Sequence, residues 1–112
     1  MTHDDPTLHA LQALDEAMEQ TIVELGDARR RIQRLFAERA AGREWRDISE
    51  TAERPLVVET VTAALDRLSS AGSRFRRAQA RALHQSGLSM DGVASLFGVT
   101  RQRVSALLRE AD

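Results

Sequence analysis

Hydrophobic residues recur every three or four positions from Leu8 to Phe36, which predicts one long amphipathic helix in the first third of the chain. Asp5 is suited to cap the start of this helix with Pro6 in its first turn, and Gly42 to end it after about Ala41. With Leu11 as position a of a heptad, the a positions are Leu11, Met18, Leu25, Ile32 and Arg39, and the d positions are Leu14, Thr21, Ala28 and Leu35.

The apolar face of this helix is wider than a two-stranded coiled-coil seam. Leu8, Ile22 and Phe36 occupy e positions, and an a/d/e face suits a helix that packs against more than one neighbour. A helix of about 50 Å is also too long for so small a globule to cover, at about 1.5 Å per residue. We therefore expect it to pack with the next helix and with a second copy, in parallel or antiparallel orientation. The residues predicted to mediate dimerisation are Leu11, Leu14, Met18, Ile22, Leu25, Ile32, Leu35 and Phe36.

The middle of the chain predicts a polar connector and two further helices. Residues 42–54 are mostly polar, and we interpret their large apolar residue Trp45 as a plug that closes the bundle, the alternative being an anchor for a partner. Pro55 is suited to open a helix that ends at Gly72. The residues expected on the core-facing side of that helix are Val58, Val61, Leu65 and Leu68. Ser73 is suited to cap a separate helix that ends at Gly87.

The last segment predicts two short helices, Met90–Phe97 and Arg101–Glu110, separated by Gly98-Val99-Thr100. Ala94 stands where the first faces the second, and a small side chain there lets the two backbones approach. Gly98 is suited to the left-handed conformation that turns the chain, and the Thr100 hydroxyl to a cap. The side chains expected to bury this corner are Val93, Phe97, Val99, Val104, Leu107 and Leu108. The combined spacing is typical of a helix-turn-helix.

These elements predict an all-α fold with two domains. Residues 1–72 form a long N-terminal amphipathic, coiled-coil-like helix and a helical bundle that dimerises. Residues 73–112 form a three-helix helix-turn-helix unit without a β-wing.

Charge is distributed unevenly between these two regions. The net charge is −1, but residues 1–72 have nine arginines against fourteen acids, whereas residues 73–112 have seven arginines against three acids. A basic C-terminal third favours a polyanionic partner.

The stretch "SMDGVASLFGVTRQRVSALL" resembles the helix-turn-helix in the fourth region of major bacterial sigma factors, and it is similar to the DNA-binding domains of Hin-type recombinases. The resemblance covers residues 74–110 and implies that the chain reads the major groove of promoter or operator DNA. The 112 residues leave no space for the regions with which sigma factors bind the polymerase core, so we expect that the chain is not itself a sigma factor. Gly92 also departs from the pattern, because a better helix former is usual inside the first helix of the motif.

In this motif the first turn of the second helix lies against base edges. Forked contacts from Arg101 to guanine and from Gln102 to adenine are expected, and Ala106 is placed for a thymine methyl group. The predicted base-contacting residues are Arg101, Gln102, Ser105 and Ala106. The residues predicted to contact the DNA backbone are Thr100, Arg103, Arg109, Arg74, Arg76, Arg77 and Arg81.

The sequence therefore predicts a dimeric, sequence-specific transcription regulator that binds an inverted repeat in double-stranded DNA through the helix 101–110. The alternative is a helical adaptor that binds a transcription or signalling protein through the N-terminal helix. We expect no enzymatic activity, because no carboxylate pair, nucleophile–base set or phosphate-binding glycine loop is evident. We also expect no cofactor or metal, because cysteine is absent and His3, His9 and His84 are scattered. No signal peptide or bilayer-spanning run is evident, so we expect a soluble cytoplasmic protein associated with the nucleoid and no membrane partner.

Overall fold

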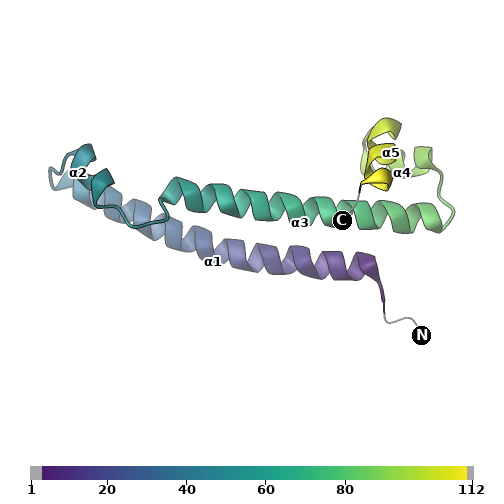
Figure 1. Cartoon of the computed structure of the whole chain (residues 1–112), viewed down its shortest axis with the longest axis horizontal. Helices are drawn as coiled ribbons and strands as arrows, with labels where there is room; N and C mark the ends of the chain where they lie inside the picture. Colours follow the sequence, from purple (N-terminus) through teal and green to yellow (C-terminus); the bar gives the residue numbers. More distant parts are fainter. Residues whose placement is uncertain (1–3, 111–112) are drawn as a thin grey trace. The chain divides into compact units, whose positions relative to one another are not determined.

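The computed structural model describes residues 4–110, and this part of the chain is all-helical, with no strand. In chain order the helices are α1 (Pro6–Ala40), α2 (Trp45–Glu50), α3 (Val57–Gln85), α4 (Met90–Phe97) and α5 (Arg101–Arg109) (Figure 1). Among the described residues, no helix has both the length and the apolar character needed to cross a membrane. His3 lies outside the described residues.

The two ends of α1 follow the local signals in the sequence. The backbone N–H of Leu8 donates to the Asp5 carboxylate at 3.0 Å, which satisfies one of the open donors of the first turn. At the other end Gly42 has φ +91°, and its N–H donates to the Arg39 carbonyl at 3.0 Å. The N–H of Arg43 donates to the Glu38 carbonyl at 3.1 Å, which completes a Schellman C-cap. The predicted capping residue and stop of α1 are confirmed.

The chain divides into two compact units, and α1 and α3 each contribute to both. One unit contains Ala17–Leu68, and the other joins the beginning of α1, up to Glu16, to the chain from Ser69 onward. We call them the 17–68 unit and the corner unit and describe each by itself.

In the 17–68 unit, α1 and the beginning of α3 pack through small side chains. Ala17, Thr21 and Ala28 of α1 are buried, as is Ala64 of α3. The Thr21 hydroxyl donates to the Ala17 carbonyl at 2.7 Å, so its polar atom is satisfied in the buried position. The d and g positions of the α1 heptad therefore form the intramolecular seam.

Arg67 connects the two helices of the 17–68 unit. Its guanidinium donates to the Thr21 hydroxyl at 3.1 Å and to the Glu24 carboxylate at 2.6 Å. The hydrogen bond from Arg67 lowers the pKa of Glu24 from its ordinary value of about 4.5. Partial burial opposes this effect, whereas the hydrogen bond from Gln20 and the positive charge of Arg67 reinforce it. Glu24 is thus held ionised in the folded state.

The segment predicted as a polar connector contains a short helix. Helix α2 buries Ile48, while Trp45 keeps 57% of its surface exposed. The prediction of a tryptophan plug is therefore wrong: the buried apolar side chain of α2 is that of Ile48, three positions further along the helix.

Helix α3 differs from the prediction at its start and in its continuity. It begins at Val57 rather than Pro55, after a cis Arg54–Pro55 peptide bond, and Glu59 accepts a hydrogen bond from the Leu56 N–H at 2.7 Å. It continues through Gly72 and Ser73, so the predicted stop and the predicted cap are both wrong. A glycine inside a helix is unfavourable by only about 1 kcal/mol. Packing along α3, where Ala64 and Ala78 are both buried, outweighs a penalty of that size.

Two of the four aliphatic residues predicted on the core-facing side of α3 are exposed. Val58 is 73% exposed and Leu65 is 61% exposed, whereas Ala64 is buried. Only Val61 and Leu68 of the predicted set are half-buried. The seam with α1 selects small side chains, so the bulkier residues of this turn face outward.

Replacing Glu24 tests the link between α1 and α3. Because the folded-state pKa is lowered, the contribution of Glu24 to stability is present above its ordinary pKa and is lost as pH falls through the lowered folded-state value. Glu24→Gln is therefore expected to lower the free energy of unfolding at pH 7, with the difference from wild type shrinking as the pH falls below about 4.5. Urea denaturation of both proteins at pH 7 and at a pH below about 4.5 measures the difference in unfolding free energy.

The matched control is Glu19→Gln, which removes an exposed carboxylate that has no ion pair among residues 4–110. It is expected to leave the unfolding free energy nearly unchanged. An equal loss of stability at neutral and acidic pH in Glu24→Gln would contradict the assigned role of the Arg67 contact.

Candidate nucleic-acid interface

The corner unit ends in two short helices with a capped turn between them. Ser89 caps α4 by accepting a hydrogen bond from the Gly92 N–H at 3.0 Å. Gly98 adopts φ +67° and ψ 35°, and the Val99 N–H donates to the Ala94 carbonyl at 3.1 Å. Thr100 then caps α5 by accepting from the Arg103 N–H at 3.1 Å. The predicted bounds of α4 and the predicted roles of Gly98 and Thr100 are confirmed.

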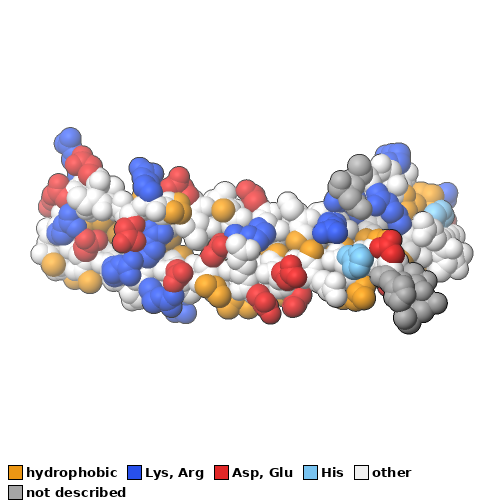
Figure 2. Space-filling model, turned by 60° about the horizontal axis from the view of Figure 1, so that its bottom comes forward, with side chains coloured by type: hydrophobic (Ala, Val, Ile, Leu, Met, Phe, Trp, Pro, Cys, Tyr) orange, Lys and Arg blue, Asp and Glu red, His pale blue; other side chains and the backbone are white. Residues whose placement is uncertain are grey.

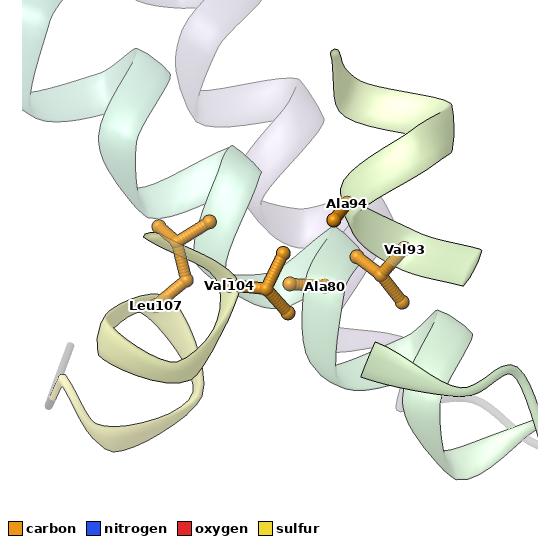
Figure 3. Close-up of a cluster of buried hydrophobic side chains, with 5 residues drawn as sticks. All are labelled: Ala80, Val93, Ala94, Val104 and Leu107. Carbon is orange, nitrogen blue, oxygen red and sulfur yellow. The ribbon is translucent and has the colours of Figure 1, made fainter. Parts of the chain in front are cut away.

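Five buried side chains from three helices hold this corner together. They are Ala80 of α3, Val93 and Ala94 of α4, and Val104 and Leu107 of α5 (Figure 3). The two alanines permit close approach of the helix backbones, while the three larger residues fill the remaining space. Among the predicted apolar residues, Phe97 and Leu108 pack against this cluster, but Val99 is 39% exposed because it lies in the turn itself.

Steric crowding within this corner explains why a glycine stands at position 92. A Cβ at that position would lie 2.9 Å from both Cγ and Cδ1 of Leu88, and 3.3 Å from the Ser89 hydroxyl. Leu88 in turn packs against the buried cluster. The glycine that departs from the motif therefore makes room for a leucine side chain, and an alanine would displace that leucine.

The first turn of α5 presents the predicted base-reading side chains to solvent. Arg101 and Gln102 are exposed, whereas Ser105 and Ala106 are half-buried. Arg101 lies 3.5 Å from the Asp91 carboxylate in an ion pair that is exposed on both sides. Such a pair contributes little in water, so it leaves Arg101 able to exchange Asp91 for another acceptor.

Glu110 contacts three of the arginines that are predicted to contact DNA. Its sequence position gave no indication of this role. Its carboxylate lies 3.5 Å from Arg77 and 3.3 Å from Arg103, and its backbone carbonyl accepts from Arg81. Arg77 and Arg81 are half-buried. The contacts with Arg77 and Arg81 attach the end of α5 to α3. They join residues 33 and 29 positions apart, so no local pattern could have predicted them, whereas Arg103 lies seven positions from Glu110.

The other predicted backbone-contacting arginines have different surroundings. Arg74 is exposed, and the Arg76 guanidinium carbon lies 4.2 Å from the centroid of the Phe97 ring, in cation–π geometry. Arg109 is exposed and donates a hydrogen bond to the Ser105 hydroxyl at 2.7 Å. Ser105 is itself one of the residues predicted to contact a base. Arg76 thus carries positive charge from α3 to the end of α4, whereas Arg74, two residues earlier, points to another side of α3.

The predicted dimerisation residues of α1 differ in their exposure. Leu14, Ile32 and Leu35 are half-buried. The exposed ones are Leu11, Met18, Ile22, Leu25 and Phe36. Hydrophobic side chains reach the molecular surface on the face that Figure 2 shows. The expected second neighbour of α1 therefore has a surface available to it.

The 17–68 unit also has a groove that the sequence did not indicate. Its volume is about 660 Å³, and its lining includes Leu35, Trp45, Ile48 and Leu56 together with Arg31 and Arg34. The exposed Trp45 thus borders a groove whose lining also includes Glu38 and Glu53, and Glu53 contacts both of these arginines.

Two glycine substitutions test whether the turn depends on the backbone of Gly98. A Cβ at Gly98 or at Gly72 would meet no atom within 4 Å, so neither substitution creates a steric clash. Gly98→Ala is expected to destabilise the protein by about 1 kcal/mol, because alanine disfavours the left-handed conformation. Gly72→Ala, within α3, is expected to stabilise it by about 0.5–1 kcal/mol. Thermal unfolding of the two variants provides the comparison, and destabilisation by both would contradict the assigned conformations.

No family model, no curated protein and no solved structure matches this chain. The resemblance of residues 74–110 to sigma-factor and recombinase DNA-binding regions therefore stays a prediction from the sequence.

Proposed function

We propose that this chain is a dimeric, sequence-specific DNA-binding protein that regulates transcription, with α4 and α5 as its helix-turn-helix. The observation that carries the proposal is the division of α5 into two faces. Val104 and Leu107 are buried against α3 and α4, while Arg101 and Gln102 in the first turn stay exposed beside the capped N-terminus of the helix. A recognition helix needs this arrangement, because its first turn meets the base edges.

Base reading in this proposal comes mainly from Arg101 and Gln102. An arginine fork matches the O6 and N7 acceptors of guanine, and a glutamine amide matches N6 and N7 of adenine. Arg101 leaves Asp91 for the base. Ser105 and Ala106, on the next turn, supply shorter contacts, with Ala106 facing a thymine methyl group.

Phosphate contacts in this proposal come from both sides of the corner. Thr100, Arg103 and Arg109 belong to α5 or its cap, and Arg74 and Arg76 belong to α3. Arg77 and Arg81 are also predicted to contact the DNA backbone, and their contacts with Glu110 support the position of α5. All the arginines of this group add positive charge near the DNA, and they strengthen binding without selecting a sequence.

The exposed face of α1 supports the dimeric part of the proposal. A row of large apolar side chains at heptad spacing on a helix surface is typical of a helix–helix interface. Two-fold pairing gives two copies of α5, which read the two halves of an inverted repeat. We place the protein in the cytoplasm, associated with the nucleoid.

The groove beside Trp45 favours a second candidate function, that of an adaptor. An apolar groove with an exposed tryptophan and nearby arginines has the composition of a protein-binding surface. In this alternative, α1 and the groove bind a transcription or signalling protein, and the corner contributes no base reading. Absence of sequence preference in DNA binding would favour it.

Alanine variants of α5 test the reading helix. Arg101→Ala is expected to reduce discrimination at one base pair by about 1–3 kcal/mol, and Gln102→Ala to do so at a neighbouring base pair. Arg74→Ala is expected to weaken binding to all sequences alike and to reduce the slope of log affinity against log salt by about 1. Gel-shift titrations on a selected site and its single-base variants measure both effects.

The control is Arg46→Ala, which removes an exposed arginine of the 17–68 unit that contacts Glu50. It is expected to leave DNA affinity unchanged. If Arg101→Ala and Gln102→Ala retain the wild-type sequence preference, α5 is not the reading helix.

A pair of neighbouring residues on α1 tests dimerisation. Ile22 is 71% exposed at an e position, and Val23 is 64% exposed on a different side of the helix. Ile22→Glu is expected to convert the dimer to a monomer, because it puts a carboxylate in the apolar interface. Val23→Glu is expected to stay dimeric. Light scattering coupled to size exclusion measures the mass, and a dimeric Ile22→Glu would contradict the assigned face.

A further inference from the structure

The outward side of α1 has an uninterrupted heptad spacing. We call its stretch from Leu8 to Phe36 the a/e face, and the members within those bounds are Leu8, Leu11, Asp15, Met18, Ile22, Leu25, Arg29, Ile32 and Phe36. All are exposed except Ile32, which is half-buried. Seven of the nine are apolar, so the two charged members stand out.

Those two charged residues are opposite in sign and symmetrically placed. Asp15 lies seven residues before Ile22, and Arg29 lies seven residues after it. Both are exposed, and neither has an ion pair or side-chain hydrogen bond among residues 4–110. By contrast, the nearby Glu24 and Asp27 are paired with Arg67 and Arg30.

The charges of the whole helix follow the same polarity. The acids between Pro6 and Asp27 are Asp15, Glu16, Glu19, Glu24 and Asp27, and no arginine occurs there. The arginines of the remainder are Arg29, Arg30, Arg31, Arg34 and Arg39, with Glu38 as the single acid. Helix α1 is thus acidic in its first part and basic in its second.

The parallel and antiparallel orientations of a helix pair differ in which charges they bring together. A parallel pair in register sets Asp15 against Asp15 and Arg29 against Arg29, and like charges oppose association. An antiparallel pair centred on Ile22 sets Asp15 of each copy at the level of Arg29 of the other. It also sets Leu8 at the level of Phe36, so the apolar ends of the face meet.

We propose that a second copy of this chain docks on the a/e face of α1 in antiparallel orientation, with the two-fold axis at Ile22 and reciprocal ion pairs between Asp15 and Arg29. This inference rests on the dimeric part of the proposed function and adds the orientation and register. The axis crosses α1 at a right angle, so the N-termini of the two α1 helices lie at opposite ends of the pair. The ion pairs set the register, and the apolar side chains supply the buried area.

Charge reversal distinguishes the two orientations. In the antiparallel dimer, Asp15→Arg replaces both ion pairs by pairs of like positive charges, and it is expected to raise the dimer dissociation constant about tenfold. Arg29→Asp is expected to do the same, and the double variant to return to within about twofold of wild type. A parallel dimer predicts no change in any of the three, because like charges face each other throughout.

Sedimentation equilibrium on the full chain, at low and high salt, measures these constants. Glu16→Arg is the control, because it makes the same charge change at an exposed position off the a/e face; it is expected to leave the dissociation constant unchanged. High salt is expected to shrink the differences between the variants and wild type. Single reversals without effect, or a double variant that does not recover, would overturn the proposal, as would a wild-type monomer.

Disulfide trapping tests the register directly, because the chain has no native cysteine. Leu8→Cys and Phe36→Cys change exposed residues, each fourteen positions from Ile22. A mixture of the two variants is expected to form a disulfide-linked heterodimer on mild oxidation, while neither variant links to itself. In an antiparallel pair the two copies of Leu8→Cys hold their thiols about 42 Å apart, at about 1.5 Å per residue. Self-linking of either variant alone, or no link in the mixture, would overturn the orientation.

DNA binding of the same variants separates this inference from the proposed function. An antiparallel link with no sequence-selective DNA binding would remove the proposed function and leave the interface. Selective DNA binding by a parallel dimer or by a monomer would remove the inference and leave the DNA-binding part of the function.

Discussion

Placement of α5 depends on one close approach of backbones at the C-terminal corner. Ala80 of α3 and Ala94 of α4 are the small members of a buried cluster that α5 joins, and Gly98 turns the chain between α4 and α5. Val93, Val104 and Leu107 then fill the space that this approach leaves. A larger side chain at either alanine, or a conformation without positive φ at Gly98, would separate α5 from the other two helices. The outward direction of Arg101 and Gln102 follows from this packing, because the opposite face of α5 is already buried.

The same use of small and large side chains separates the two faces of α1. Alanine and threonine at the d and g positions allow close packing with α3, while leucine, isoleucine, methionine and phenylalanine at a and e positions stay outside. A seam made of alanines buries little apolar area per residue. Most of the apolar area that α1 could still bury therefore belongs to its large exposed side chains, and burying that area would be favourable. Their association with another copy would use that free energy, and the polarity of the charges along the helix would select the orientation.

Local signals predicted the ends of helices better than they predicted packing. The caps at Asp5 and Thr100 and the turns at Gly42 and Gly98 depend on neighbours within five residues, so the sequence alone identified them. Gly72-Ser73 carries the same kind of signal, yet packing of α3 outweighs it. Hydrophobicity assigned Val58 and Leu65 to the core, but the close α1–α3 seam accommodates Ala64 instead. The contacts of Glu110 with Arg77 and Arg81 require tertiary proximity, which no single-sequence pattern contains.

Selection of bound fragments from random double-stranded DNA tests the central claim most directly, because it measures sequence recognition without assuming a target. The account predicts enrichment of one inverted repeat whose half-sites share a core motif, with the most strongly enriched base pairs lost when Arg101 and Gln102 are replaced. Enrichment of no sequence, with retention of DNA that depends only on salt, would contradict it.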